Sequence, residues 1–115
     1  MIVKIKNLRI DTILGVYKWE ENYQRTLLFN VEIESDCKNA VVTDNIEDTI
    51  DYDHITNQIR DYVVNNRCRL IEKMVSQILD LIMQDERISK CTLEVDKLKV
   101  YDFVDSFSVT QTRIR

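Results

Sequence analysis

A strict alternation of apolar and polar side chains over residues 27–34 constrains this fold more than any other sequence feature. One phase is apolar and the other is mostly polar: Leu27, Phe29, Val31 and Ile33 against Leu28, Asn30, Glu32 and Glu34. Successive side chains of a strand point to opposite faces of its sheet, so this strand has one apolar face and one polar face. The pattern predicts an antiparallel sheet that is covered on one side only.

Two helical patterns in the middle of the chain are suited to cover that sheet. We expect Asp51 to cap the first helix, which ends near Asn65 and Asn66. Its apolar face carries Ile55, Ile59, Tyr62 and Val63. In the connection before it, Asp44 and Glu47 resemble a capping box, so a short helical turn is expected to start at Asp44.

The second helical pattern carries a continuous apolar stripe and is expected to end within residues 84–87. The stripe consists of Leu70, Ile71, Met74, Val75, Ile78, Leu81 and Ile82. Glu72 falls in the first turn, where the helix dipole and free N–H groups favour an ionised carboxylate. Such a carboxylate can accept two neighbouring N–H donors of a ligand, or it can simply complement the dipole.

Strand patterns flank the two helices on both sides. In the strand from residue 3 to 16 the apolar phase changes near Asn7, which predicts a bulge. Gly15, the only glycine, is expected to adopt a positive φ or to allow a close contact with its backbone. Residues 17–25 read as a polar loop with aromatic side chains, and the last strands lie around residues 91–97 and 106–110.

Lys97 ends the apolar phase of its strand, after Cys91, Leu93 and Val95. Partial burial disfavours the charged form of a lysine, which prepares the amine for proton transfer. The alternative is a lysine whose stem lies on the edge of the core while its amine stays in water. The residues alone leave both interpretations open.

Composition narrows the possible functions. The chain has 115 residues and a net charge of −4, so we expect a single domain, residues 1–115, with no nucleic-acid or membrane partner. Three widely spaced cysteines favour free thiols in a reducing cytoplasm. With one histidine and no glycine-rich loop, no metal or cofactor site is expected.

The order strand, strand, helix, helix, strand, strand predicts an α+β domain, in which a four-stranded antiparallel sheet carries two helices on one face. A sheet of this kind leaves two open edges, so pairing across subunits is expected.

Four segments together resemble the family of dihydroneopterin aldolases and dihydroneopterin triphosphate epimerases. They are Gly15-Val16-Tyr17-Lys18-Trp19-Glu20, Asp48-Thr49-Ile50-Asp51-Tyr52, Leu70-Ile71-Glu72 and Val95-Asp96-Lys97. The resemblance covers nearly the whole chain and implies the tunnelling fold. It also implies a homo-tetramer or homo-octamer with active sites between subunits and a small-molecule pterin substrate.

The same resemblance implies a role for each candidate residue. Glu72 matches the anchor for the 2-amino and N3 edge of the pterin, with Ile71 beside it in contact with the ring. Lys97 matches the general acid/base, and Glu20 matches a carboxylate near the reacting side chain. Tyr52 matches a tyrosine from the neighbouring subunit that helps to protonate the intermediate.

The resemblance favours 7,8-dihydroneopterin aldolase of folate biosynthesis, which releases glycolaldehyde. The alternatives are dihydroneopterin triphosphate 2′-epimerase and a non-catalytic pterin-binding ring. Arg25 stands where aldolases commonly have glutamine, and Leu98 stands where many members have proline. The candidate cations for binding a triphosphate are Lys18, Arg25, Arg69 and Lys99.

Overall fold

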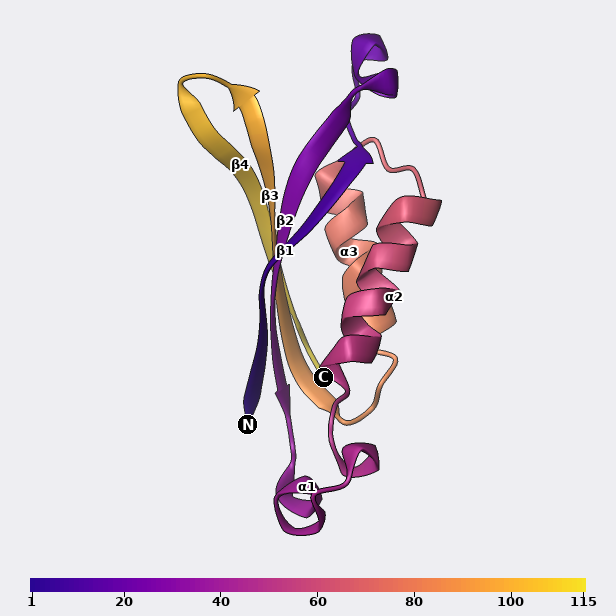
Figure 1. Ribbon diagram of the computed structural model, residues 1–115, viewed down its shortest axis with the longest axis vertical. Coiled ribbons are helices and arrows are strands. Elements are labelled where there is room, and N and C mark those ends of the chain that lie inside the picture. The colour runs from indigo at the N-terminus through magenta and orange to yellow at the C-terminus, as the bar shows by residue number, and fades with distance from the viewer.

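The computed structural model describes all 115 residues. The strands are β1 (Ile2–Ile13), β2 (Gln24–Ser35), β3 (Ile88–Tyr101) and β4 (Val104–Ile114). The helices are α1 (Lys38–Thr43), α2 (Tyr52–Asn65) and α3 (Ile71–Ile82), and two 3-10 turns are η1 (Lys18–Asn22) and η2 (Ile46–Asp48). The sheet is antiparallel in the order β1-β2-β3-β4, and α2 and α3 cover one of its faces (Figure 1). The predicted α+β architecture is confirmed.

The alternation in β2 produces the expected two-faced strand. Leu27, Phe29, Val31 and Ile33 are all buried beneath the helices. They pack in one cluster with Met74, Val75, Ile78, Leu79 and Ile82 of α3. Leu79 was not part of the predicted stripe, and Leu70, which was, is exposed because it precedes the helix as its N-cap. Burial of each such side chain contributes about 1.5–3 kcal/mol, so this layer is the main source of stability in the fold.

The predicted bulge in β1 is present. The pairing register between β1 and β2 shifts between Ile5 and Leu8, and Asn7 adopts a φ of 52°. The Asn7 backbone N–H donates to Asn30 Oδ1 at 2.9 Å, and Asn30 Nδ2 donates to Asn7 Oδ1 at 3.2 Å. A second irregularity, between Leu98 and Tyr101 of β3, was not predicted.

The connection between β2 and α2 differs from the prediction. Residues Lys38–Thr43 form the short helix α1, which has no side-chain cap to mark its start. Asp44 ends this helix in the left-handed conformation, with φ 57°, and therefore does not begin the next turn. Asn45 caps η2 instead, accepting the Glu47 N–H at 3.0 Å.

The ends of the two long helices agree with the sequence more closely. Asp51 caps α2 by accepting the N–H groups of Asp53 and His54 at 3.0 and 3.3 Å. The helix ends at Asn65 as predicted, although Asn66 is extended and not left-handed. Helix α3 ends at Ile82, earlier than expected, because the chain turns there into β3.

Two remaining predictions concern the cysteines and the membrane. Cys37, Cys68 and Cys91 are all free thiols and all buried. None of the helices combines the length and the apolar character needed to cross a bilayer.

Candidate active site

The carboxylate of Glu20 is the centre of the site. Turn η1 brings Glu20 back toward the chain that precedes it, so that Glu20 Oε1 accepts the Tyr17 N–H at 3.3 Å. Gly15 makes this geometry possible: it has a φ of 149°, and a Cβ placed there would lie 2.2 Å from the Glu20 carboxylate carbon. The predicted positive φ and close contact are both present at this glycine.

Lys97 extends from β3 to the same carboxylate. Its Nζ donates to Glu20 Oε2 at 3.2 Å, and the two side chains are only 18% and 5% exposed. The side chain follows Cys91, Leu93 and Val95 along the buried face of the strand. The partial burial predicted for Lys97 is therefore present, and the amine is held by a charged partner.

Arg25 is a third member of this cluster, and sequence reasoning missed its place. Its Nη2 lies 3.7 Å from Glu20 Oε2, and the residue is buried. Arg25 is one of the four candidate cations for a triphosphate, and in this chain its guanidinium faces Glu20. A signal was present in the sequence, because Arg25 shares the buried phase of β2 with Leu27 and Phe29.

Burial and charge act in opposite directions on Glu20. Desolvation raises the pKa of a carboxyl group, but here it is outweighed by the Lys97 hydrogen bond, the Tyr17 N–H and the charges of Lys97 and Arg25. The net result is a pKa of Glu20 below its ordinary value. The site therefore holds an ionised carboxylate at neutral pH.

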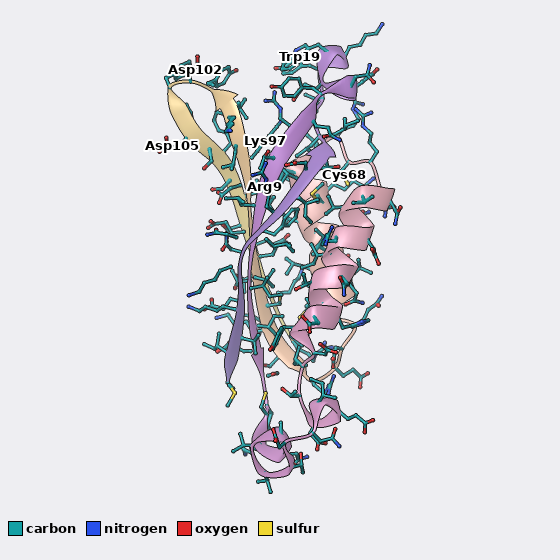
Figure 2. All side chains as sticks on the ribbon, viewed as in Figure 1. Arg9, Trp19, Cys68, Lys97, Asp102 and Asp105 are labelled. Carbon is teal, nitrogen blue, oxygen red and sulfur yellow. The ribbon has the colours of Figure 1, made fainter.

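The start of α3 lies at the same end of the molecule. Arg69 Nη2 donates to the Val16 carbonyl at 3.3 Å, and Arg67 Nη1 donates to the Glu21 carbonyl at 3.4 Å. These bonds tie the segment before α3 to the loop that carries Glu20. Figure 2 shows Lys97 toward the same end as Trp19 and Cys68.

Glu72 lies in the first turn of α3, as predicted. Leu70 occupies the N-cap position and provides no side-chain hydrogen bond, so the turn keeps its free N–H groups. In the isolated chain Glu72 is exposed and Ile71 is half-buried. The structure thus brings Glu20, Lys97, Ile71 and Glu72 to one end of the sheet.

Tyr52 does not join this cluster within one chain. It is the first residue of α2 and is exposed. The 14-residue helix spans about 21 Å, and its opposite end leads into the segment that contacts the Glu20 loop. Tyr52 therefore lies at the end of α2 that points away from the Glu20 loop.

Fold and site together define a class: a small α+β protein in which a buried carboxylate holds a lysine amine, at the same end of the molecule as an open helix start. Such a pair is suited to proton transfer on a small ligand. The chain belongs to the dihydroneopterin aldolase family, whose model matches residues 3–112. The resemblance carried by the four sequence segments is confirmed.

Known proteins similar to this chain fall into two groups. Dihydroneopterin triphosphate 2′-epimerase of Escherichia coli is 33% identical over 95% of this chain and 91% of its own. Dihydroneopterin aldolase of Haemophilus influenzae is 30% identical over 84% of this chain and 82% of its own. The structure of Escherichia coli dihydroneopterin aldolase in complex with neopterin superposes with a TM-score of 0.93, covering 98% of both chains at 24% identity. That last likeness establishes the shared fold.

Proposed function

We propose that this protein is a 7,8-dihydroneopterin aldolase that forms 6-hydroxymethyl-7,8-dihydropterin and glycolaldehyde in folate biosynthesis. The observation that carries the proposal is the contact between the Lys97 amine and the ionised, buried Glu20 carboxylate, 3.2 Å apart. Membership of the dihydroneopterin aldolase family supports the choice of substrate.

Glu72 is proposed to anchor the pterin ring. The 2-amino and N3–H groups of the ring are two adjacent donors, and one carboxylate can accept both. The position of Glu72 in the first turn of α3 supports this role, because the helix dipole favours its charge. Ile71 is proposed to contact the ring beside it.

Lys97 is proposed to act as the general acid/base. Removal of the proton from the 2′-hydroxyl lets the bond between C1′ and C2′ break, which releases glycolaldehyde. The bonding electrons move into the C6=N5 imine of the ring and form an enol-like intermediate. Protonation at C1′ then gives the hydroxymethyl product, so the protons and electrons balance without a cofactor. Glu20 keeps the Lys97 amine in place throughout.

Tyr52 is proposed to help that final protonation from a neighbouring copy. Its place at the opposite end of α2 supports this, since the Tyr52 of the same chain is too far from Lys97 to act. Sites of this kind require an assembly, and we propose a homo-tetramer or homo-octamer. The open edges at β1 and β4 are suited to pairing between copies. The free cysteines support a cytoplasmic location.

Dihydroneopterin triphosphate 2′-epimerase is the second candidate. The observation in its favour is the 33% identity to the Escherichia coli epimerase over most of both chains. The same intermediate serves both reactions, because re-addition of the aldehyde to the opposite face gives the epimer. Against it, Arg25 is occupied by Glu20 and Arg69 by the Val16 carbonyl, so two of four candidate phosphate ligands are already engaged.

Product analysis with dihydroneopterin and with its triphosphate, supplied separately, tests the proposal. Glycolaldehyde from dihydroneopterin supports the aldolase. An epimer of the triphosphate without cleavage supports the second candidate. If neither substrate is converted, the result contradicts both enzymes and favours a non-catalytic pterin-binding ring. Lys97→Ala, prepared in parallel, excludes activity from a contaminating enzyme.

A further inference from the structure

We propose that Arg25 is a positioning residue of this site, because it gives Glu20 a second cationic partner that does not depend on Lys97. The effect of Arg25 on turnover rests on the function proposed above. The effect of Arg25 on the Glu20 carboxylate is independent of that function, since it is a property of the protein without substrate.

The two cations meet at one oxygen atom of the carboxylate. Lys97 Nζ lies 3.2 Å and Arg25 Nη2 lies 3.7 Å from Glu20 Oε2. The other oxygen, Oε1, accepts the Tyr17 N–H. Both oxygens are thus engaged, and the charged groups that contact Glu20 are Lys97 from β3 and Arg25 from β2.

Arg25 is itself held in a fixed orientation. Its Nη1 donates to the Lys99 carbonyl at 3.3 Å, where β3 bulges and Lys99 has a φ of 56°. Its guanidinium carbon lies 5.5 Å from the Trp19 ring centroid and 4.5 Å from that of Tyr23. Because Trp19 belongs to η1 and Tyr23 directly follows it, Arg25 joins the turn that carries Glu20 to the strand that carries Lys97.

Stability alone is a poor explanation for this arginine. The residue is 4% exposed, and its Nε is buried without a hydrogen-bond partner in the chain. Burial of a cation with an unsatisfied donor is costly, even with a carboxylate beside it. An apolar side chain would continue the buried row of Leu27 and Phe29 without that cost.

The chemistry supplies a better explanation. A lysine that exchanges protons spends part of each cycle as a neutral amine, and in that state it no longer balances the Glu20 charge. A buried carboxylate without a cation would then take up a proton or turn away. Arginine remains protonated at all relevant pH values, so it keeps Glu20 charged and oriented while Lys97 changes state.

A titration of Glu20 tests this role without any substrate. The side-chain carboxyl carbon of Glu20 is followed by NMR in the wild type, Arg25→Gln, Lys97→Met and the double variant. We expect Glu20 to stay ionised at neutral pH in each single variant. In the double variant, the titration midpoint of Glu20 should rise by more than the sum of its rises in the two single variants. An unchanged midpoint when Arg25→Gln is added to Lys97→Met would refute the proposal.

Kinetics then measure the consequence for turnover. Arg25→Gln is expected to lower kcat by roughly ten-fold and to narrow its pH profile, while the pterin Kd changes less than two-fold. Arg25→Lys should recover part of kcat and of the profile, since it restores the charge. Arg60→Gln is a matched control on the exposed face of α2 and should change neither constant.

The two proposals fail in different ways. A wild-type protein that converts neither pterin substrate contradicts the aldolase, whereas the Glu20 titration still decides the role of Arg25. An active wild type with an identical pH profile and kcat in Arg25→Gln contradicts the role of Arg25 alone. If Arg25→Gln does not fold, Arg25→Lys still tests the role of this residue, because it keeps the positive charge and the aliphatic stem.

Discussion

The carboxylate of Glu20 occupies the space that a side chain at position 15 would fill. A Cβ on Gly15 would lie 2.2 Å from one carboxylate oxygen and 2.4 Å from the other. Because Gly15 has no side chain, the Glu20 carboxylate at the centre of the site can lie against its backbone. Neither residue alone explains the geometry, because Glu20 needs the space and Gly15 supplies it.

Gly15→Ala is expected to destabilise the protein and displace Glu20. The positive φ contributes about 1–3 kcal/mol to the loss, and the clash adds to it. Chemical denaturation of Gly15→Ala, Glu20→Ala and the double variant separates the two effects. A cost of Gly15→Ala that is equally large in the Glu20→Ala background would contradict the clash.

Lys97→Ala is expected to bind pterin but to lose turnover. Removal of a general acid/base lowers kcat by about 10²–10⁴-fold, whereas ring binding depends on other groups. Single-turnover assays and fluorescence titration with neopterin measure the two properties. Turnover equal to that of the wild type would remove Lys97 from the catalytic machinery.

Glu72→Ala is expected to weaken pterin binding by roughly 100-fold in Kd, because two charge-assisted hydrogen bonds are lost. Glu86→Gln, at an exposed carboxylate in the turn after α3, serves as the control and should bind normally. Calorimetric titration with neopterin measures both. Normal affinity in Glu72→Ala would overturn the anchor role.

Tyr52→Phe and Lys97→Ala subunits are expected to complement each other when mixed. If each site takes Lys97 from one copy and Tyr52 from another, random mixing restores roughly a quarter of the sites. Activity is measured after the two inactive proteins are denatured and refolded together. Mixtures no more active than the parents would argue against a shared site.

The Glu20 ion cluster is expected to stabilise the protein in a pH-dependent way. The pKa of Glu20 is lowered in the folded state, so the contribution is fully present above the unfolded value, about 4.3. It is lost as the pH falls through the lower folded-state value. Urea denaturation of the wild type and Glu20→Gln over this range measures the difference. A stability difference that does not change as the medium becomes acidic would contradict the cluster.

Local patterns predicted the elements of this fold because their causes are local. The period of two in β2 and the apolar stripe of α3 each report which face of the element is buried. Asp51 predicted the start of α2 because a cap acts within three residues of itself. Helix α1 was missed because it has only six residues and its N-cap residue, Cys37, provides no side-chain hydrogen bond.

The candidate site was predictable only in part. The place of Lys97 at the end of a buried row follows from strand periodicity alone, and the place of Glu72 follows from the helix pattern. The contact of Arg25 with Glu20 does not follow from periodicity, although Arg25 continues a buried row of β2 in the same way as Lys97 does in β3. Periodicity states that a charge is buried, but it does not state which partner neutralises it.

The sequence by itself therefore determined the strands, the long helices, the buried faces and the glycine that permits a tight approach. These depend on residues within a few positions of one another. Only the tertiary structure decided that Arg25 and Lys97 meet at one carboxylate oxygen of Glu20. It also decided that Tyr52 lies at the end of α2 that points away from this site. The reason is physical: such contacts join segments up to 77 residues apart, and their geometry is determined by how the sheet and helices pack.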